Sequence, residues 1–332
     1  MRPDSQLFYR PTRLSEKEIL ERAREARRLS SPCRLCPRRC RVDRVSGEKG
    51  YCGAGPVPTI AAALPHFGEE PPLTGSGGAG TLFFSRCNMR CVYCQNHQIS
   101  QGFVGYEVSP ALLAREMLAL QDARCSNIEP VSPGHHLSGL LAALAIARRK
   151  GLTLPVVYNT NGYESLETLD LLDGIVDVYL PDLKYASNEI ALRYSDAADY
   201  VETAREAVLA MRRQVGNLVV DMRGLAIKGL IIRHLTLPGN AAGSEETLAW
   251  IGEHMPRTVT ISLMAQYSPL YRSNRHAEIN RRVSEDEYDR VVDLAWRMGF
   301  RNVFVQDPAS QEVGIPDFEQ EAPFHWQGEP PN

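Results

Sequence analysis

The sequence predicts an α/β fold with a parallel sheet, open or closed into a barrel, and a cysteine-rich extension at its N-terminal end. Two observations predict it. From Thr81 onward, short apolar strands alternate with helical stretches, and seven of the eight cysteines fall into two tight groups. With 43% apolar residues the chain can bury a large core, which argues against an intrinsically disordered protein.

Residues 1–75 are predicted to hold one helix and a metal-binding region. Ser15 and Glu18 form a capping box at the start of the helix. A stretch broken by Pro and Gly then runs from Cys33 to Cys52. Residues 68–80 contain two prolines and several glycines, which is typical of a linker or a long loop.

A parallel α/β domain, with its sheet open or closed into a barrel, is expected over residues 76–310, followed by a C-terminal tail over residues 311–332. Its strands are expected at residues 81–85, 127–132, 154–160, 175–180, 230–237, 258–264 and 302–306. Its helices are expected at residues 110–121, 137–150, 166–172, 186–215, 247–254 and 284–298. In parallel α/β sheets, functional groups gather at the carboxyl ends of the strands, so loops there are the candidates for a site.

The second cysteine group follows the first of these strands. Cys87, Cys91 and Cys94 have the spacing C-x3-C-x2-C, with no fourth cysteine nearby. Three thiolates on a four-iron cluster leave one iron without a protein ligand, whereas an electron-carrying cluster normally takes four. The alternative is a zinc site that takes His97 as its fourth ligand.

This motif, with Tyr93 at its aromatic position, resembles the signature of the radical S-adenosylmethionine (radical SAM) superfamily, and the resemblance extends over roughly residues 80–307. It implies a partial (β/α)6 barrel and a 4Fe–4S cluster held by Cys87, Cys91 and Cys94. It also implies that the open iron chelates the amine and carboxylate of S-adenosylmethionine. One electron from the reduced cluster then cleaves this cofactor and releases a 5′-deoxyadenosyl radical.

Three later segments resemble the pyruvate formate-lyase activating enzymes and their relatives: residues 158–162, 180–185 and 233–239. The resemblance implies that hydrogen is abstracted from a glycine of a partner protein. It implies a cofactor-binding set of Tyr93, Ser132, Asn159, Thr160, Asn161, Asp182 and Arg233, and catalytic roles for Lys184 and His234. Asn159 stands where activating enzymes have Asp, which removes a carboxylate from any monovalent-cation site.

Other polar residues at strand ends remain open to two interpretations. Asp182 and Lys184 lie on one side of an extended strand end. They hold the zwitterionic methionine group or an associated cation, or they form a surface ion pair. His135 and His136 are either proton relays or ordinary loop residues. Gln266 and Tyr267 either contact a substrate or pack within their loop.

The first cysteine group is a complete ligand set. Cys33, Cys36, Cys40 and Cys52 supply four thiolates, which suit one zinc ion or a second iron–sulfur cluster. The choice between these metals stays open. Cys125 stands alone and is predicted to be a small buried apolar residue.

Charge and hydropathy restrict the partners. Residues 1–50 carry 14 Lys/Arg and 7 Asp/Glu, more typical of a solvated helix face than of a nucleic-acid contact. No apolar stretch reaches the ~20 residues of a membrane span, and no secretory signal is visible, so a cytoplasmic protein is expected. The expected partners are an electron donor such as flavodoxin or ferredoxin and a protein substrate. Radical chemistry on a small molecule or RNA and a non-catalytic metal-binding module are the other function classes.

Overall fold

The structure is a computed structural model that describes residues 14–307 and 314–324. Within these residues ten strands form one sheet, in the order β10-β9-β8-β6-β5-β4-β2-β1-β3, with β7 paired to β8. The parallel strands are β2 (Ala79–Phe84), β4 (Ile128–Val131), β5 (Val157–Thr160), β6 (Val178–Pro181), β8 (Ala226–Leu235), β9 (Thr260–Met264) and β10 (Asn302–Val305). The predicted α/β class with a mostly parallel sheet is therefore confirmed.

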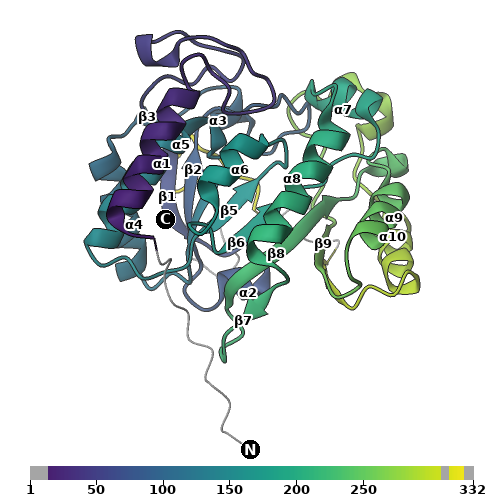
Figure 1. Cartoon of the computed structure of the whole chain (residues 1–332). Coiled ribbons are helices and arrows are strands. Elements are labelled where there is room, and N and C mark those ends of the chain that lie inside the picture. Colours follow the sequence, from purple (N-terminus) through teal and green to yellow (C-terminus); the bar gives the residue numbers. More distant parts are fainter. Residues whose placement is uncertain (1–13, 308–313, 325–332) are drawn as a thin grey trace, which may run out of the picture.

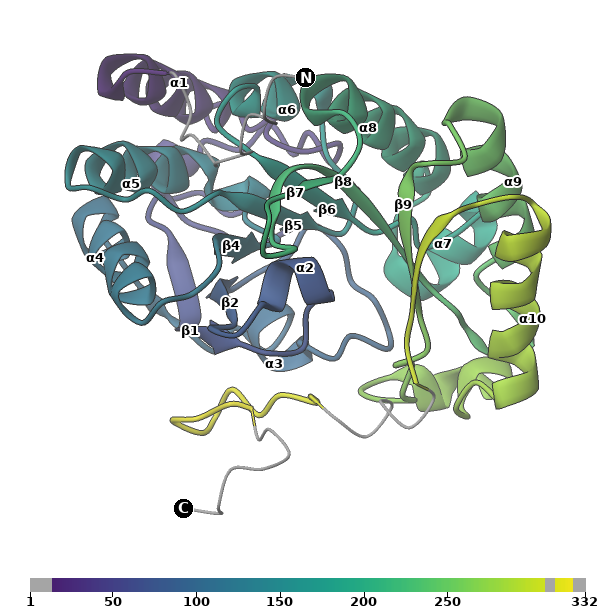
Figure 2. The ribbon, with the colours of Figure 1, turned by 90° about the horizontal axis from the view of Figure 1, so that it is seen from below.

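Helices cover the outer face of the curved sheet (Figures 1 and 2). In chain order they are α4 (Pro110–Asp122), α5 (Leu137–Arg149), α6 (Leu166–Leu172), α8 (Tyr200–Val215), α9 (Ser244–His254) and α10 (Glu285–Arg297). The N-terminal helix α1 (Glu16–Leu29) packs on α5 as a further layer. Its predicted capping box is present, because the Ser15 side chain accepts from the Glu18 backbone while the Glu18 side chain accepts from the Ser15 backbone. No helix among the described residues is long and apolar enough to cross a bilayer.

The predicted helix over residues 186–215 is wrong in one respect, because it is two helices. The short helix α7 (Asn188–Ser195) ends at Asp196, whose φ of 54° places it in the left-handed region, and α8 begins at Tyr200. Helical periodicity continues on both sides of the break, so the break itself was not predictable. It matters for function because Ser195, the last residue of α7, contacts Cys91.

Residues 68–80, predicted to be a linker or a long loop, are a loop that packs into the interior and not a free linker. The segment contains the short helix α2 (Pro71–Thr74), whose Leu73 is fully buried, and the first two residues of β2. Leu73 packs against Val157, Val178 and Ile231 and so closes the amino-terminal end of the sheet's inner face with an apolar layer. The prolines and glycines at this position make a tight turn into the interior instead of a flexible connection.

Strand β1 (Thr59–His66) was not predicted. It pairs antiparallel with β2 and with the short strand β3 (Tyr106–Glu107), so the N-terminal region contributes to the same sheet as the parallel strands. The short strand β7 (Val219–Val220), which pairs with β8, was not predicted either. The division of the chain at residue 75 stays a prediction.

Candidate active site

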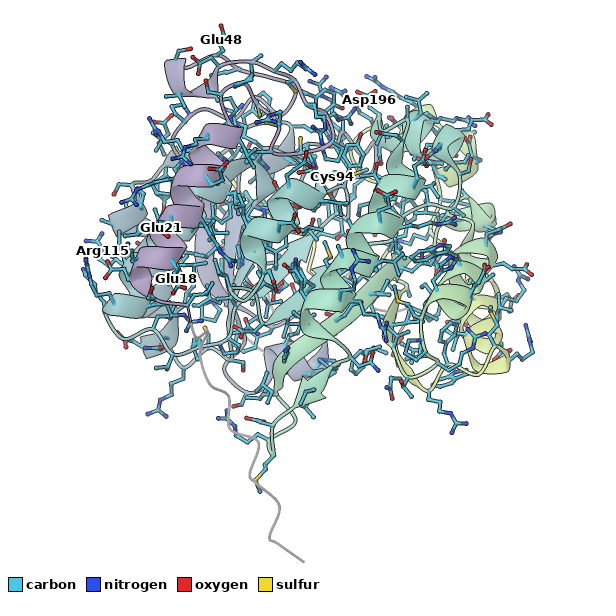
Figure 3. All side chains as sticks on the ribbon, viewed as in Figure 1. Glu18, Glu21, Glu48, Cys94, Arg115 and Asp196 are labelled. Atoms are coloured by element: carbon cyan, nitrogen blue, oxygen red, sulfur yellow. The ribbon has the colours of Figure 1, made fainter. Side chains whose placement is uncertain are left out.

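A cavity of about 380 Å³ opens at the carboxyl ends of the parallel strands. It brings together most of the predicted site residues: Cys87, Cys91, Tyr93, Cys94, Ser132, Asn159, Asn161, Asp182, Lys184 and Arg233, with Gln266 and Tyr267 beside them. Cys94, labelled in Figure 3, lies toward the same end of the molecule as Glu48 of the cysteine-rich segment and Asp196 after α7. The sheet therefore gathers side chains from residues 87 to 267 around one space.

The three thiols of the Cys87–Cys94 loop all line this cavity, and each has a hydrogen-bonding neighbour. Cys87 Sγ accepts from the Met89 backbone and from Asn161 Nδ2, both at 3.4 Å. Ser195 Oγ donates to Cys91 Sγ at 3.0 Å, and Ser100 Oγ lies 3.3 Å from Cys94 Sγ. Hydrogen bonds to the sulfurs are one of the ways in which a protein sets the reduction potential of an iron–sulfur cluster.

Burial determines the protonation of these thiols. Burial, with a smaller contribution from the neighbouring thiol of Cys91, raises the pKa of Cys87 to about 12 and that of Cys94 to about 11. Three adjacent thiolates are therefore unfavourable by themselves, and the positive charge of bound iron compensates for them. The donor set and its environment fit a cluster.

The zinc alternative needs His97 as the fourth ligand, but in the structure the His97 ring makes other contacts. Its Nδ1 atom lies 3.2 Å from the Cys94 carbonyl oxygen, and its ring stacks on Tyr271 with centroids 4.8 Å apart. In the described part of the chain, no three His, Cys, Asp or Glu side chains converge as a single metal ion requires. His97 therefore does not complete a zinc site with the three thiols.

Buried hydroxyl groups connect Tyr93 to the thiol of Cys91. Tyr93 Oη lies 2.5 Å from Tyr185 Oη, and Tyr185 Oη lies 2.6 Å from Ser195 Oγ, which donates to Cys91. All three side chains are at most 6% exposed. Tyr93, the aromatic residue of the motif, thus holds the Cys87–Cys94 loop, called the cluster loop below, against the end of α7 through a chain of hydrogen bonds.

Asp182 and Lys184 form a partly buried ion pair at the end of β6. Lys184 Nζ lies 2.5 Å from Asp182 Oδ2, and the two side chains are 15% and 17% exposed. Burial alone would lower the pKa of Lys184, but the Asp182 carboxylate, together with Cys91 and Tyr200, offsets this and the pKa is raised. Tyr200 Oη fixes the loop by accepting from the Lys184 backbone and lying 2.9 Å from the carbonyl oxygens of Asn161 and Asp182.

Two predicted site residues do not line the cavity. Thr160 points to the other face of β5 and donates to Glu164 at 2.6 Å. His234 is fully buried: its Nδ1 donates to the Leu183 carbonyl oxygen at 2.6 Å and its Nε2 accepts from Ser244 Oγ at 2.8 Å. Because β8 alternates faces, Arg233 points into the cavity and His234 away from it. His234 is placed to position the Asp182–Lys184 loop, not to touch a substrate.

His135 and His136 are buried beneath the cluster loop, and the Nε2 atoms of both bind the Ser85 carbonyl oxygen, at 2.9 and 3.2 Å. Neither lines the main cavity, so the structure gives these residues a structural role.

Their burial predicts a pH dependence of folding. Burial lowers the pKa of His135 from 6.5 to about 4, so this residue is neutral in the folded protein between these values while the unfolded chain binds a proton. The free energy of unfolding should therefore fall as pH drops from 6.5 to 4, by about 3 kcal/mol for this residue. Urea denaturation at several pH values should show a shallower slope for His135→Gln, whereas the exposed control His254→Gln keeps it. An unchanged slope in His135→Gln would contradict this assignment.

Acidic residues of the cavity region were missed by the sequence interpretation. Glu69 and Glu70 lie in the segment predicted as a linker, and both line the cavity, where they pair with Arg233. Glu129 is fully buried on β4 next to them. A carboxyl group inside an otherwise apolar strand was the available signal for Glu129, and an acidic pair before two prolines was the signal for the others.

The first cysteine group packs directly against the cluster loop. Arg38 Nε donates to the Asn88 carbonyl oxygen at 2.9 Å, and the guanidinium groups of Arg38 and Arg90 lie 3.8 and 4.4 Å from the centre of the Tyr51 ring. The Tyr51 backbone in turn donates to Cys40 Sγ at 3.3 Å. The two cysteine groups, well separated in the sequence, are thus neighbours in the fold.

Three of the four thiols in this first group are buried: Cys33, Cys36 and Cys52. Burial raises the pKa of Cys36, and the nearby thiols of Cys52 and Cys33 raise it further. Such a thiol group becomes favourable once a cation binds it. Within the described residues these thiols do not converge as a single metal ion requires, so a second metal centre here stays a prediction.

Comparisons with known proteins place this site in a family. The family model described as "Radical SAM superfamily" matches residues 81–226. An uncharacterized protein of Methanocaldococcus jannaschii, MJ0674, is 30% identical over 279 residues, which cover 81% of this chain and 76% of that protein. The chain belongs to the radical SAM superfamily. It is therefore a radical SAM enzyme, and membership implies a 4Fe–4S cluster and S-adenosylmethionine as cofactors.

Two solved structures are similar at low identity. Streptococcus suis SuiB bound to its precursor peptide SuiA gives a TM-score of 0.46 at 11% identity, over 67% of this chain and 46% of SuiB, so the chain spans about half the length of that protein. HydG, a maturase of the [FeFe]-hydrogenase, gives 0.45 at 12% identity, over 94% of this chain and 72% of HydG.

Proposed function

We propose that Cys87, Cys91 and Cys94 hold the 4Fe–4S cluster and that S-adenosylmethionine occupies the adjoining cavity. The observation that carries this proposal is that the three thiols share one cavity with the polar ends of β4, β5 and β6. When bound, the cluster supplies the electron that cleaves S-adenosylmethionine to a 5′-deoxyadenosyl radical. The barrel holds the substrate beside the cofactor and keeps water from the reacting atoms.

The strand ends provide groups that match the zwitterionic methionine part. Asp182 and Lys184 offer one charge of each sign, and Asn159 and Asn161 offer amides, all within the cavity lining. Asn161 also donates to Asn88 at 2.8 Å, so the group that faces the cofactor is tied to the cluster loop. Ser132, whose φ of 50° turns its loop back over the sheet, completes this part of the lining.

The experiment that tests this function measures 5′-deoxyadenosine. Protein reconstituted anaerobically with iron and sulfide, then given dithionite and S-adenosylmethionine, should form this product. Reduced flavodoxin or ferredoxin should replace dithionite, because the proposed partner is an electron donor of this class. A reconstituted protein with full cluster content and no product formation would contradict the proposal.

Asp182 gives a more specific prediction. Asp182→Ala removes the anionic group from the cavity and leaves Lys184 without its partner, so the affinity for S-adenosylmethionine should fall about tenfold, or about 1.4 kcal/mol. Iron content should not change, because Asp182 donates nothing to the three thiols. Equilibrium binding and iron analysis measure both effects, with Asp293→Ala on the exposed face of α10 as the matched control. Unchanged affinity would return Asp182 to a structural role.

Two classes of substrate can donate the hydrogen atom that the radical abstracts. The resemblance of residues 158–162, 180–185 and 233–239 to activating enzymes supports hydrogen abstraction from a glycine of a partner protein. A small-molecule substrate is the second candidate, and one observation favours it. Residues 314–324 run along the β1 and α3 (His97–Ser100) side of the molecule (Figure 2), and Gly314 and Phe324 line the cavity.

This C-terminal segment is held by specific contacts. Gln98 Nε2 donates to Asp317 Oδ1 at 2.8 Å, and the Phe318 backbone donates to Gln98 Oε1 at the same distance. Phe318 and Phe324 are buried against Phe83. A protein loop would have to displace this segment to reach the cavity. Separation of a cell extract by size, followed by a test of which fraction increases 5′-deoxyadenosine formation, distinguishes the two substrate classes.

A further inference from the structure

A second charged group, which the cofactor proposal does not use, lines the same cavity. Arg233 on β8 donates through Nε to Glu70 Oε1 at 2.8 Å and through Nη2 to Glu70 Oε2 at 2.6 Å, and Nη2 also contacts Glu69 Oε2. The three side chains are at most 13% exposed. Because buried charges persist only when they are compensated, the balance of charge in this group is informative.

Carboxyl groups outnumber cations here. Arg233 is shared by Glu69 and Glu70, and Glu129 lies within electrostatic reach of all three. Burial, and next the charge of Glu69, raise the pKa of Glu129 well above its usual value, so its carboxyl group is neutral until a cation lies beside it. Burial would raise the pKa of Glu69, but Arg233 and His66 together outweigh it and the pKa is lowered, so Glu69 is ionised. One guanidinium therefore faces two carboxylates and a third carboxyl group, and His66 beside Glu69 adds a cation only when it is protonated.

The carboxyl group of Glu129 gives independent evidence that a hydrogen-bonding partner is missing from this group of side chains. Its Oε1 atom accepts from Asn159 Nδ2 at 2.8 Å. The side chain is fully buried, and its Oε2 atom has no hydrogen-bond partner within residues 14–307 and 314–324. Buried polar atoms are seldom left unpaired, so an additional hydrogen-bonding group is expected beside this carboxyl group.

The surroundings suit an organic cation better than a metal ion. The rings of Phe83 and Phe324 lie with centroids 5.2 Å apart, and His66 lies 4.7 Å from Phe324, next to the carboxylates. Aromatic faces attract ammonium and guanidinium groups. No three potential metal ligands converge within the described residues, Glu69, Glu70 and Glu129 included.

We propose that Glu69, Glu70 and Glu129 form a subsite that binds an ammonium or guanidinium group of the substrate. The inference rests on the proposed function, because it names the substrate class of the same cavity. Arg233 is then a positioning residue, which holds the two carboxylates side by side, and Phe83 and Phe324 cover the alkyl part of the substrate.

Calorimetric titration of the full-length protein at pH 8 tests this subsite. The probes are butylammonium and butylguanidinium, with 1-butanol and butyrate as neutral and anionic analogues of the same length. The cations should bind and the two analogues should not. N-acetyl-glycyl-lysine amide carries the same ammonium on a peptide. Preference for it over butylammonium indicates a peptide source, and the reverse preference indicates a free amine.

Two variants and one control connect binding to these residues. Glu70→Gln and Glu129→Gln should each weaken cation binding at least about tenfold. The exposed control Glu245→Gln on α9 should leave it unchanged. Glu129→Gln retains the shape of the side chain and both ion pairs of Arg233, so it remains informative if Glu70→Gln disturbs folding.

Four results would overturn the inference. They are no binding of the cations, equal binding of 1-butanol, unchanged cation binding in both variants, and competition by S-adenosylhomocysteine, which would place the cation in the cofactor's own site. Cation binding requires no cluster. A protein that binds the cations and does not cleave S-adenosylmethionine contradicts only the proposed function. A protein that cleaves it and does not bind the cations contradicts only the subsite.

Discussion

Replacing any one of Cys87, Cys91 and Cys94 with alanine should reduce 5′-deoxyadenosine formation at least about 1,000-fold, a loss of about 4 kcal/mol of transition-state stabilisation. The physical reason is that two thiolates do not hold a four-iron cluster with one defined open site. The measurement is product formed per reconstituted protein, with iron and sulfide determined on the same sample.

Cys125 offers a matched control for these variants. It is a buried cysteine near the start of β4 and does not line the cavity. Cys125→Ala should keep both iron content and product formation, apart from a small loss of stability from the missing sulfur. Wild-type cleavage in any one of the three loop variants would contradict the cluster assignment.

The second large effect is expected at the N-terminal cysteines. A protein in which Cys87, Cys91 and Cys94 are all alanine should still bind metal through the first cysteine group, and adding Cys36→Ala should remove it. Because the binding energy of a structural metal is also folding energy, Cys36→Ala alone should make residues 30–60 sensitive to proteases. Metal analysis and limited proteolysis measure these outcomes.

The metal that remains in the triple variant identifies the role of this centre. Retained zinc indicates a structural site, and retained iron with sulfide indicates an electron relay. The relay is physically reasonable because Arg38 and Tyr51 connect this segment to the cluster loop through Asn88 and Arg90. The absence of any metal after anaerobic preparation would show that these four cysteines form no site.

Much of the fold was predictable because each parallel strand is a short apolar run between helices with clear start signals. The seven parallel strands lie within a few residues of their predicted positions, and the Ser15 capping box is present. Strand β1 was missed because it follows a cysteine-rich segment and its pattern of burial is irregular. Its pairing with β2 depends on tertiary contacts that a local pattern does not contain.

The site was predictable where polar residues stand at the carboxyl end of a strand. It was less predictable where the direction of a side chain determines whether the residue faces the cavity. Arg233 and His234 are adjacent in a polar strand end, yet only Arg233 faces the cavity. The partners of Arg233 come from residues 69 and 70, far away in sequence and within a segment whose composition indicates a linker. Pairing of this kind emerges only when the chain is folded.

The central claim is that S-adenosylmethionine meets a cluster held by Cys87, Cys91 and Cys94, and electron–nuclear double resonance tests it most directly. The reduced cluster is prepared in the wild-type protein, the triple Cys87/Cys91/Cys94→Ala protein serves as the blank for signals from a second centre, and S-adenosylmethionine labelled with ¹⁵N in its amine or ¹⁷O in its carboxylate is added. The account predicts hyperfine coupling of both labels to the cluster. The absence of coupling when the cofactor is bound at saturation would contradict it.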